Sequence, residues 1–378
     1  MTLVPPQPGA LDAAERLRYA RHLSLAGIGE AGQLRLKQAS VLLVGTGGLG
    51  SPAALYLAAA GVGHLGLADH DSVDLSNLQR QVLFGTHDVG RPKALVAQQR
   101  LQDLNPHLRI SVHAERVTAA NARRLVAAYD VVIDGTDRLA TRYLVNDACV
   151  LERRALVSAA IHRFEGQAMT WLPDGKTPCY RCLFPDSAAA AVPNCADAGV
   201  LGVLPGVMGS LQATEALKLL LGIGMPLAGR LLVYDALSLA FQEFSFKRRS
   251  DCIACGDHPT LTDLQPDPET AMPAIDSWSA QDLAHTLQSG PPADLVMVDV
   301  REPMEWQAGR LPGSLHIPLG QLPGRLAEIP PGRVLFICAG GVRSLHACHV
   351  AAQAGREVIN LDGGLYAWAA AFGPPPAP

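Results

Sequence analysis

Gly45, Gly47 and Gly50 are spaced as G-x-G-x-x-G, between a short apolar run and an alanine-rich segment. Glycines at this spacing let the backbone approach a phosphate, and the amides at the start of a following helix bind the anion. Asp69 ends the next apolar run, where a carboxylate can accept a ribose hydroxyl. The pattern predicts a nucleotide site, and taken alone it fits an ordinary dinucleotide-binding dehydrogenase equally well.

Two cations and one carboxylate further along favour a triphosphate. Arg80 and Lys93 add positive charge that the two phosphates of a nicotinamide cofactor do not need. Asp137 follows another apolar run, where a carboxylate can hold Mg²⁺. The alternative interpretation is that Arg80 and Lys93 are solvated surface charges.

Four of the eight cysteines form two Cys-x-x-Cys pairs, Cys179 with Cys182 and Cys252 with Cys255. Two such pairs supply four thiolates with the spacing of a closed tetrahedral zinc site, which would be structural because protein fills every position. The alternative is two redox pairs. Eight cysteines are too few in a chain of this length for a disulfide scaffold.

Cys338 begins the segment Cys-Ala-Gly-Gly-Val-Arg-Ser, which ends at Ser344 and lies between an apolar run and a helical pattern. Loop amides and a helix N-terminus stabilise a thiolate at such a position, and Arg343 adds a cation. Cysteine phosphatases place five residues between their cysteine and arginine to surround a phosphate, whereas four lie between Cys338 and Arg343. The shorter loop favours a persulfide.

Strands and helices must position these residues. Apolar runs at 40–44, 63–68, 109–114 and 130–133 alternate with helical patterns at 52–60 and 93–104. This alternation predicts an α/β fold with a doubly wound, Rossmann-like, mostly parallel sheet. Strands at 295–298 and 334–337 and a helix at 344–354 predict a second, smaller α/β domain.

The prolines indicate where the domains end, and the net charge indicates which partners to expect. A proline-rich stretch predicts a first domain at 1–257, a linker at 258–274 and a second domain at 275–378. A net charge of −4 gives no reason to expect a nucleic-acid partner.

The uncharged stretch 41–68 is long enough for a membrane span, but seven glycines and a proline favour strand, loop and helix. With no signal-peptide pattern, we expect a cytoplasmic protein.

The first domain resembles the ubiquitin-activating enzyme superfamily, and its MoeB and ThiF adenylyltransferases in particular. The resemblance covers nearly all of residues 12–257 and rests on the segment 18–23, the glycine loop, the segment 69–81, Lys93 and the segment 134–137. It implies that ATP and Mg²⁺ are used to adenylate the C-terminal glycine of a ubiquitin-fold sulfur-carrier protein.

The resemblance also implies roles for individual residues. Asp69 binds the ribose, Asp137 positions magnesium, and Arg21 reaches the phosphates of a partner protomer, which implies a homodimer. Further nucleotide contacts are expected from Gly48, Ser76, Asn77, Leu78, Gln79, Arg80 and Lys93. The family usually has asparagine after the magnesium-site aspartate, and this chain has Arg138 there. That cation would either alter the nucleotide contacts or point to solvent.

Cys195 lies among Asn, Asp and Gly residues, after a run of four alanines that suggests a mobile loop. The plain interpretation of a lone cysteine is a small buried side chain. In the MoeB and ThiF family, the matching cysteine attacks or holds the activated carboxylate, so the resemblance implies a catalytic role for Cys195. Cys149 and Cys348 stand in helical apolar patterns, and we expect both to pack in cores.

The segment from Cys338 to Ser344 resembles the loop of the rhodanese family, Cys-x-x-Gly-x-Arg-Ser. The segments 298–302 and 313–319 match other signatures of that family, and the resemblance covers about residues 275–372. It implies that Cys338 carries sulfur as a persulfide. The alternative is a rhodanese fold without catalytic activity.

Together the two resemblances predict one reaction sequence, like that of fused MoeB–rhodanese proteins of molybdopterin synthesis. The first domain would adenylate the carrier, and Cys338 would deliver sulfur to give a thiocarboxylate. A cysteine desulfurase or thiosulfate would supply the sulfur. The same chemistry serves carriers of thiamin, cysteine and tRNA thiolation, and a modifier-activating enzyme that ends in a thioester remains an alternative.

Overall fold

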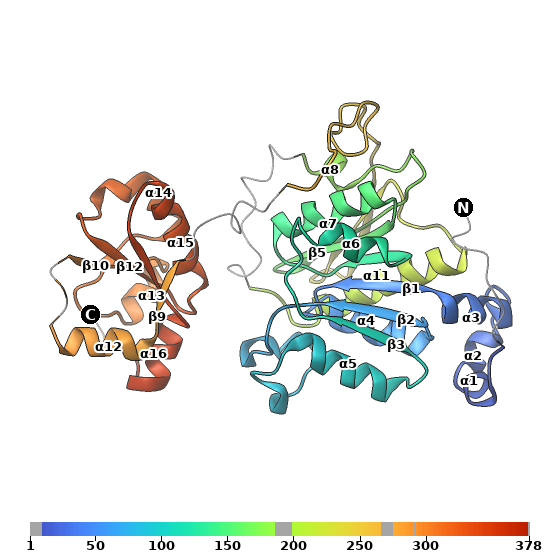
Figure 1. Ribbon diagram of the computed structural model, residues 1–378, viewed down its shortest axis with the longest axis horizontal. Coiled ribbons are helices and arrows are strands. Elements are labelled where there is room, and N and C mark those ends of the chain that lie inside the picture. Colours follow the sequence, from blue (N-terminus) through green and yellow to red (C-terminus); the bar gives the residue numbers. More distant parts are fainter. Residues whose placement is uncertain (1–9, 186–198, 266–274, 291, 293, 377–378) are drawn as a thin grey trace. The chain divides into compact units, whose positions relative to one another are not determined.

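The computed structural model describes residues 10–185, 199–265, 275–290, 292 and 294–376. The chain divides into two compact units, Met1–Asp267 and Pro268–Pro378. Each unit contains one β-sheet with helices packed on it (Figure 1). Within the described residues, no helix combines the length and the apolar character that crossing a membrane requires.

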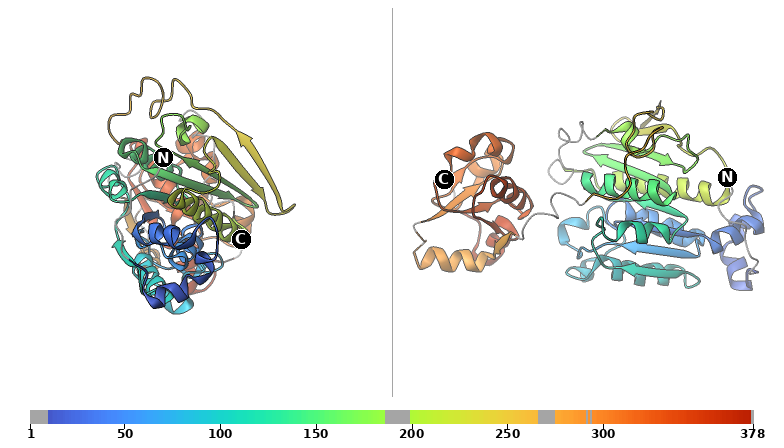
Figure 2. Two further views of the ribbon diagram at one scale, coloured as in Figure 1. Left: turned by 90° about the vertical axis from the view of Figure 1, so that its right-hand side faces the viewer. Right: turned by 45° about the horizontal axis from the view of Figure 1, so that its top comes forward.

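The sheet of the first unit has eight strands in the order β3-β2-β1-β4-β5-β6-β7-β8. The first five strands pair in parallel, and the last three extend the sheet in antiparallel pairs. Figure 2 shows the β7–β8 hairpin at one edge of the sheet. The strands are β1 (Ser40–Val44), β2 (His64–Ala68), β3 (Arg109–His113), β4 (Val131–Asp134), β5 (Ala155–His162), β6 (Glu165–Trp171), β7 (Arg230–Asp235) and β8 (Ala240–Ser245).

Both faces of this sheet carry helices because its central strands are apolar on both sides. Val41 and Leu43 face one core, with α4 and α5, while Leu42 and Val44 face the other, with α6 and α7. The predicted doubly wound arrangement is confirmed. The helices of the unit are α1 (Ala13–Arg18), α2 (Ala20–Leu23), α3 (Gly29–Gln38), α4 (Gly50–Ala60), α5 (Lys93–Leu104), α6 (Ala122–Ala127), α7 (Leu139–Glu152), α8 (Tyr180–Leu183) and α11 (Leu204–Leu221).

The first unit extends past residue 257, where the sequence places the start of the linker. The backbone amides of Thr260 and Leu261 donate to the carbonyl of Ile253, each at 2.9 Å. Leu264 is buried in the core beside α6 and α7, and Leu261 packs against it. These two leucines hold part of the proline-rich stretch against the first unit.

The second unit has a five-stranded parallel sheet in the order β11-β10-β12-β13-β9. Phe336 faces the core beneath α15, and Leu335 and Ile337 face the core beneath α12 and α16. This arrangement confirms the predicted smaller α/β domain. Its elements are β9 (Asp276–Trp278), α12 (Ala280–Gln288), β10 (Leu295–Asp299), α13 (Pro303–Ala308), β11 (Leu315–His316), α14 (Leu322–Arg325), β12 (Arg333–Ile337), α15 (Val342–Gln353), β13 (Val358–Leu361) and α16 (Gly364–Phe372).

Candidate active site and metal centre

A cleft opens at the carboxyl ends of β1, β2 and β4, where parallel α/β sheets bind ligands. We call it the glycine-loop cleft. Of the residues predicted from the sequence, it is lined by Gly45, Gly47, Gly48, Asp69, Arg80, Lys93, Asp137 and Arg138. Further lining residues include His70, Asp71, Gln81, Glu115, Arg116, Thr136 and Arg142.

The glycines of the loop have distinct structural roles. Gly45 has a φ of +87°, and its amide donates to the carbonyl of Ala68 at 2.8 Å. Gly50 does not line the cleft, because it lies under the loop at the start of α4. A Cβ on Gly50 would stand 2.0 Å from the carbonyl oxygen of Gly45. Gly50 therefore allows helix and loop to pack closely, while Gly47 and Gly48 present backbone to the cleft.

Asp69 holds the glycine loop as well as lining the cleft. Its Oδ2 accepts hydrogen bonds from both the amide and the hydroxyl of Thr46, each at 2.8 Å. Its Oδ1 accepts from the amide of Asp71 at 3.0 Å. Two acceptor positions are thus used on Oδ2 and one on Oδ1, which leaves Oδ1 able to accept a hydroxyl.

Lys93 reaches the cleft from the first turn of α5 and is paired there. Its Nζ lies 3.0 Å from Oδ2 of Asp71, and the lysine side chain is only 6% exposed while that of Asp71 is 53% exposed. Burial would raise the pKa of Asp71, but the charge of Lys93 and its hydrogen bond lower that pKa below the usual value. Nothing in the sequence pattern marks Asp71 as the partner of Lys93.

A buried carboxylate shapes the loop that carries Asp137. The Oδ1 of Asp134 accepts from the amide of Thr136 at 3.0 Å and from its hydroxyl at 2.6 Å. Its Oδ2 accepts from the hydroxyl of Ser158 at 3.1 Å. These bonds turn the chain at the end of β4, so that Asp137 is exposed at the cleft.

Arg142 and Gln81 are two of the polar residues of the cleft that the sequence pattern did not single out. Arg142, on the first turns of α7, is buried and donates from Nη2 to the carbonyl of Thr136 at 2.8 Å. Gln81 is also buried, and its Oε1 has no hydrogen-bond partner among the described residues. A buried amide oxygen that lacks a partner at a cleft is a place where a polar ligand can bind. Its sequence signal is that it ends the segment 69–81, directly after Arg80.

The segment from Ser76 to Gln79 stands beside the cleft and does not line it. Asp74 caps its short 3₁₀ turn by accepting from the amide of Ser76 at 2.8 Å, and Arg80 donates to the Ser76 carbonyl at 3.2 Å. Asn77 and Leu78 belong to the same turn. The segment therefore places the guanidinium of Arg80 at the cleft.

Of the predicted residues, Arg21 does not line the cleft. Arg21 is exposed on α2, and its side chain makes no hydrogen bond or ion pair within the described part of the chain. Cys195 lies outside the described residues. The chain that follows it returns to the cleft region: a Cβ on Gly202 would meet the Gln79 carbonyl at 2.3 Å, and a Cβ on Gly48 would contact Pro205 at 3.2 Å.

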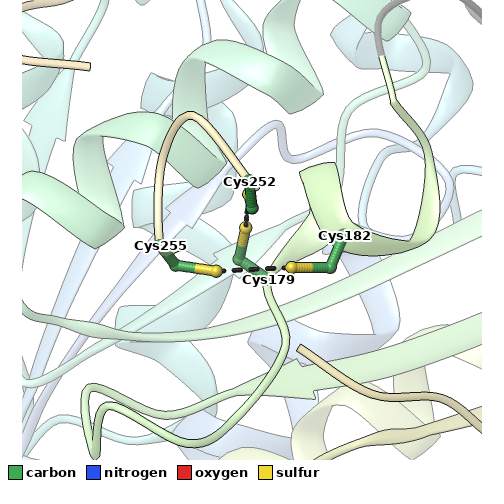
Figure 3. Close-up of side chains that lie close together, drawn as sticks. All are labelled: Cys179, Cys182, Cys252 and Cys255. Atoms are coloured by element: carbon green, nitrogen blue, oxygen red, sulfur yellow. Dashed lines mark hydrogen bonds between the residues drawn. The ribbon is translucent and has the colours of Figure 1, made fainter. Parts of the chain in front are cut away.

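The four cysteines of the two Cys-x-x-Cys pairs come together, as Figure 3 shows. Their sulfur atoms all lie within 4.8 Å of one another. The Sγ of Cys179 is 3.7 Å from that of Cys252, and the Sγ of Cys182 is 3.4 Å from that of Cys255. Sulfurs bound to one tetrahedral zinc ion at about 2.3 Å stand about 3.8 Å apart, so the arrangement fits that metal.

The surroundings of the cysteine site favour metal binding. Hydrogen bonding with Cys179 first, and with Cys255 and the Arg249 amide next, lowers the pKa of Cys182, while hydrogen bonding with Cys182 first raises the pKa of Cys179, so the four thiols share their protons. The guanidinium of Arg181, between the first two cysteines, binds Asp147 of α7 through Nε at 2.7 Å and Nη2 at 2.6 Å. This ion pair connects the cysteine site to the helix that carries Arg142.

Cys338 lies at the end of β12, directly before α15. Its Sγ accepts a hydrogen bond from the amide of Gly341 at 3.1 Å and lies 3.3 Å from the hydroxyl of Ser344. The residue is only 1% exposed. A sulfur anion at this atom therefore faces an amide, a hydroxyl and the N-terminus of a helix, which all stabilise negative charge.

The first residues of α16 hold this loop through backbone hydrogen bonds. The amide of Leu365 donates to the carbonyl of Cys338, and that of Tyr366 to the carbonyl of Ala339, each at 2.8 Å. A Cβ on Gly364 would stand 2.4 Å from the Cys338 carbonyl oxygen. Gly364 therefore allows the two segments to approach, and the sequence analysis did not identify it.

A family model described as the ThiF family matches residues 19–254, and one described as a rhodanese-like domain matches residues 279–371. The first match covers more than half of the chain. The chain belongs to the ThiF family. This ThiF family member carries a rhodanese-like domain at residues that include Cys338, Arg343 and Ser344.

Several curated ThiF relatives are similar to this chain over most of their length. "Sulfur carrier protein adenylyltransferase" of Thermus thermophilus is 54% identical over 252 residues, covering 65% of this chain and 93% of the relative. "Probable adenylyltransferase/sulfurtransferase MoeZ" of Mycobacterium tuberculosis is 42% identical over 97% of both chains. "Adenylyltransferase and sulfurtransferase MOCS3" of Sus scrofa is 47% identical over 85% of this chain and 74% of the relative.

Solved structures share the fold of the first unit. The crystal structure of Escherichia coli MccB with ATP has a TM-score of 0.55 at 23% identity, covering 63% of this chain and 74% of MccB. The structure of PaaA has a TM-score of 0.55 at 24% identity, covering 64% of this chain and 77% of PaaA. At this level of identity the similarity concerns the fold of the ThiF domain alone.

Proposed function

We propose that the chain adenylates the C-terminal glycine of a ubiquitin-fold sulfur-carrier protein and then converts it to a thiocarboxylate with sulfur from Cys338. The observation that carries this proposal is the presence in one chain of a cleft lined by glycine backbone and cations and of a buried thiol in an amide-lined loop. The names of the relatives, which join adenylyltransferase to sulfurtransferase, support the same pairing.

The adenylation step needs no general base from the protein. The carrier's carboxylate is ionised near neutral pH, so it attacks the α-phosphate of ATP without a general base. Catalysis then depends on alignment and on neutralising the charge of the departing pyrophosphate. Arg80, Lys93 and Arg142 line the cleft and can supply that charge, while the glycine loop supplies backbone amides. Mg²⁺, held by Asp137, would add further positive charge to the phosphates.

We infer that two copies of the chain form a homodimer in which Arg21 serves the partner's cleft. The exposure of Arg21 and the lack of a partner for it within the described residues support this role.

The cytoplasmic location of the protein stays a prediction.

The cysteine site is proposed to hold one structural Zn²⁺. Four sulfur atoms at these separations fill a tetrahedral shell and leave no position for water, which excludes hydrolytic chemistry at such an ion. Its place between the segments around Cys179 and Cys252, which are distant in sequence, supports a role in holding the first unit together.

Sulfur transfer completes the proposed function. A persulfide on Cys338 attacks the acyl-adenylate carbonyl, AMP leaves with the bonding electrons, and the product is an acyl disulfide on Cys338. A second thiolate, for which Cys195 is the proposed candidate, then attacks the Cys338 sulfur; the sulfur–sulfur bond of the acyl disulfide breaks, the thiocarboxylate leaves with the electron pair, and a disulfide with Cys338 remains. Alternatively, Cys195 would carry the acyl group as a thioester or acyl disulfide between the two stages. Molybdopterin synthesis is the proposed pathway, because the relatives that match most of the chain include MoeZ and MOCS3. Carriers of thiamin, cysteine or tRNA thiolation are the alternatives.

Exchange of pyrophosphate into ATP tests the adenylation step and identifies the carrier. We expect exchange to depend on a carrier with a free C-terminal glycine and to be stimulated most by a molybdopterin-type carrier. A carrier whose terminal glycine has been deleted provides the control. If no ubiquitin-fold carrier of the four pathways stimulates exchange, adenylation of such carriers is wrong.

A further inference from the structure

The cation of the sulfur loop is already paired with a carboxylate. Both terminal nitrogens of Arg343 bind Glu305 of α13, Nη1 to Oε2 and Nη2 to Oε1, each at 2.7 Å. The Arg343 side chain is 19% exposed and that of Glu305 is 35% exposed, so water screens the pair only in part. Arg343 is the one basic residue between Cys338 and Ser344.

The second guanidinium of this region is paired as well. Arg301 is buried and binds both carboxylate oxygens of Asp299 through Nε at 3.0 Å, and its Nη2 donates to the carbonyl of Gly309 at 2.7 Å. Hydrogen bonding from Arg343 lowers the pKa of Glu305, with the charge of Arg301 contributing, so Glu305 is ionised near neutral pH. Arg343 and Arg301 thus each meet a fixed negative charge, whereas the guanidinium of Arg310 lies over the ring of Trp306, 4.8 Å from its centre.

The pairing of Arg343 with Glu305 should affect the two possible sulfur donors differently, because their leaving groups carry different charges. With thiosulfate, the Cys338 thiolate attacks the outer sulfur, the sulfur–sulfur bond breaks, and sulfite leaves as a dianion with the electron pair. A dianion benefits from an available cation, and Glu305 competes with it for Arg343. With a protein persulfide, the thiolate attacks the outer sulfur and the donor cysteine leaves as a thiolate with a single charge, so it needs less compensation.

Two side chains beside the loop are apolar and exposed, and another protein could contact them. Val342 directly precedes Arg343 and is exposed. Tyr366 is also exposed, and a Cβ on Gly340 would contact its ring at 3.7 Å. Exposed apolar side chains around a reactive group are typical of a surface on which another protein docks.

We propose that Glu305 is a specificity-determining residue of the sulfur site, which disfavours thiosulfate and leaves a persulfide on another protein's cysteine as the preferred donor. The inference rests on the proposed sulfur transfer through Cys338 and names its donor class. Glu305 does not react itself; it acts by neutralising Arg343.

The test measures loading of Cys338 in the full chain from two donors. One is thiosulfate, with transfer to cyanide as the readout, and the other is a cysteine desulfurase charged with L-cysteine. Glu305→Gln keeps the size of the side chain and the hydrogen bond that it accepts from the Glu302 amide. We expect kcat/KM for thiosulfate to rise about ten-fold, mainly through a lower KM, while loading from the desulfurase changes less than about two-fold.

Three variants separate charge from other effects. Glu305→Asp keeps the charge and should leave thiosulfate activity close to that of the wild type. Glu305→Gln combined with Arg343→Gln should lose the gain, because the gain requires the guanidinium of Arg343. Glu328→Gln removes a glutamate that pairs with Arg325 instead, and should change nothing.

The result that overturns the inference is a thiosulfate kcat/KM for Glu305→Gln that is unchanged or lower than that of the wild type. Failure of the proposed function has a different signature. If the wild type accepts sulfur from neither donor, or if Cys338→Ala accepts it as well as the wild type, sulfur transfer through Cys338 is wrong and the inference fails with it.

Discussion

Lys93 and Asp71 form an ion pair inside the glycine-loop cleft, with 3.0 Å between Nζ and Oδ2. The lysine is buried, and without a ligand Asp71 is the acid that the structure places against its ammonium group. A nucleotide phosphate would offer the same ammonium group a second anion. We expect the two anions to compete for this one cation, so that Asp71 opposes nucleotide binding and stabilises the ligand-free protein.

Asp71→Asn should therefore lower stability without ligand and increase the response to ATP. We expect a loss of about 1 kcal/mol in the free energy of unfolding, a modest value because Asp71 is half exposed. The shift in melting temperature on adding ATP with Mg²⁺ should be larger than in the wild type, measured by calorimetry. Asp103→Asn, which removes an exposed charge on α5 away from the cleft, is the control. Equal ATP shifts in both variants would contradict this role.

The same pair predicts a pH dependence. The pKa of Asp71 in the folded protein lies below its usual value of 3.8, so its contribution to stability is complete above that value. The contribution is lost as the pH falls through the folded-state pKa. The difference in unfolding free energy between wild type and Asp71→Asn should stay constant from about pH 7 to pH 5 and shrink towards pH 3. A difference that grows on acidification would show that another group is responsible.

Gly50 at the glycine loop and Gly206 on α11 provide a matched pair of substitutions, one in a crowded place and one in open space. Gly50→Ala places a Cβ 2.0 Å from the Gly45 carbonyl, which is backbone and cannot move aside. We expect a loss of about 3 kcal/mol or more in stability, or an altered loop with pyrophosphate exchange reduced at least about ten-fold. Gly206→Ala on α11 has open space and should gain about 0.5–1 kcal/mol. Chemical denaturation of both variants measures the contrast.

The sequence predicted best those features that depend on neighbouring residues. The glycine loop, the strand before it and the helix after it follow from local pattern, and the structure has them at β1 and α4. The cysteine site was predictable although its halves are distant, because each Cys-x-x-Cys pair supplies two ligands with fixed spacing. The structure brings the pairs together.

The features that could not be predicted depend on tertiary contacts. Glu305 and Arg343 are 38 residues apart, and neither signals the other. Arg142 reaches the cleft because α7 packs with one end against the turn at Thr136. The strand β8 has five exposed residues and no alternation of apolar and polar side chains, so its pattern does not indicate a strand. Its pairing with β7 determines its conformation.

Removal of one cysteine tests the metal centre. We expect elemental analysis to find about one zinc ion per chain in the wild type and much less in Cys252→Ser, because three thiolates hold a structural ion much less tightly than four. The melting temperature should fall, since the site joins distant segments of the first unit. Cys149→Ala is the control: Cys149 is buried in the same core but is not a ligand, so this variant loses packing and keeps its zinc. Full zinc content in Cys252→Ser would show that the proposed ligand set is wrong.

The two cysteines of the second unit should have different roles: Cys338 reacts, and Cys348 packs in the core. Cys338→Ala should abolish thiocarboxylate formation, seen as the loss of a 16 Da increase in carrier mass, and should leave pyrophosphate exchange unchanged because the glycine-loop cleft belongs to the first unit. Cys348 is the matched control, since it lies in the same core as Cys338 and belongs to α15. Burial first, and the nearby Cys338 next, raise the pKa of Cys348 to about 12, so it stays a protonated and unreactive thiol near neutral pH. Cys348→Ala should therefore still form thiocarboxylate, with only the stability loss of a smaller core side chain. Loss of exchange together with thiocarboxylate in Cys338→Ala would contradict separate sites for adenylation and sulfur transfer.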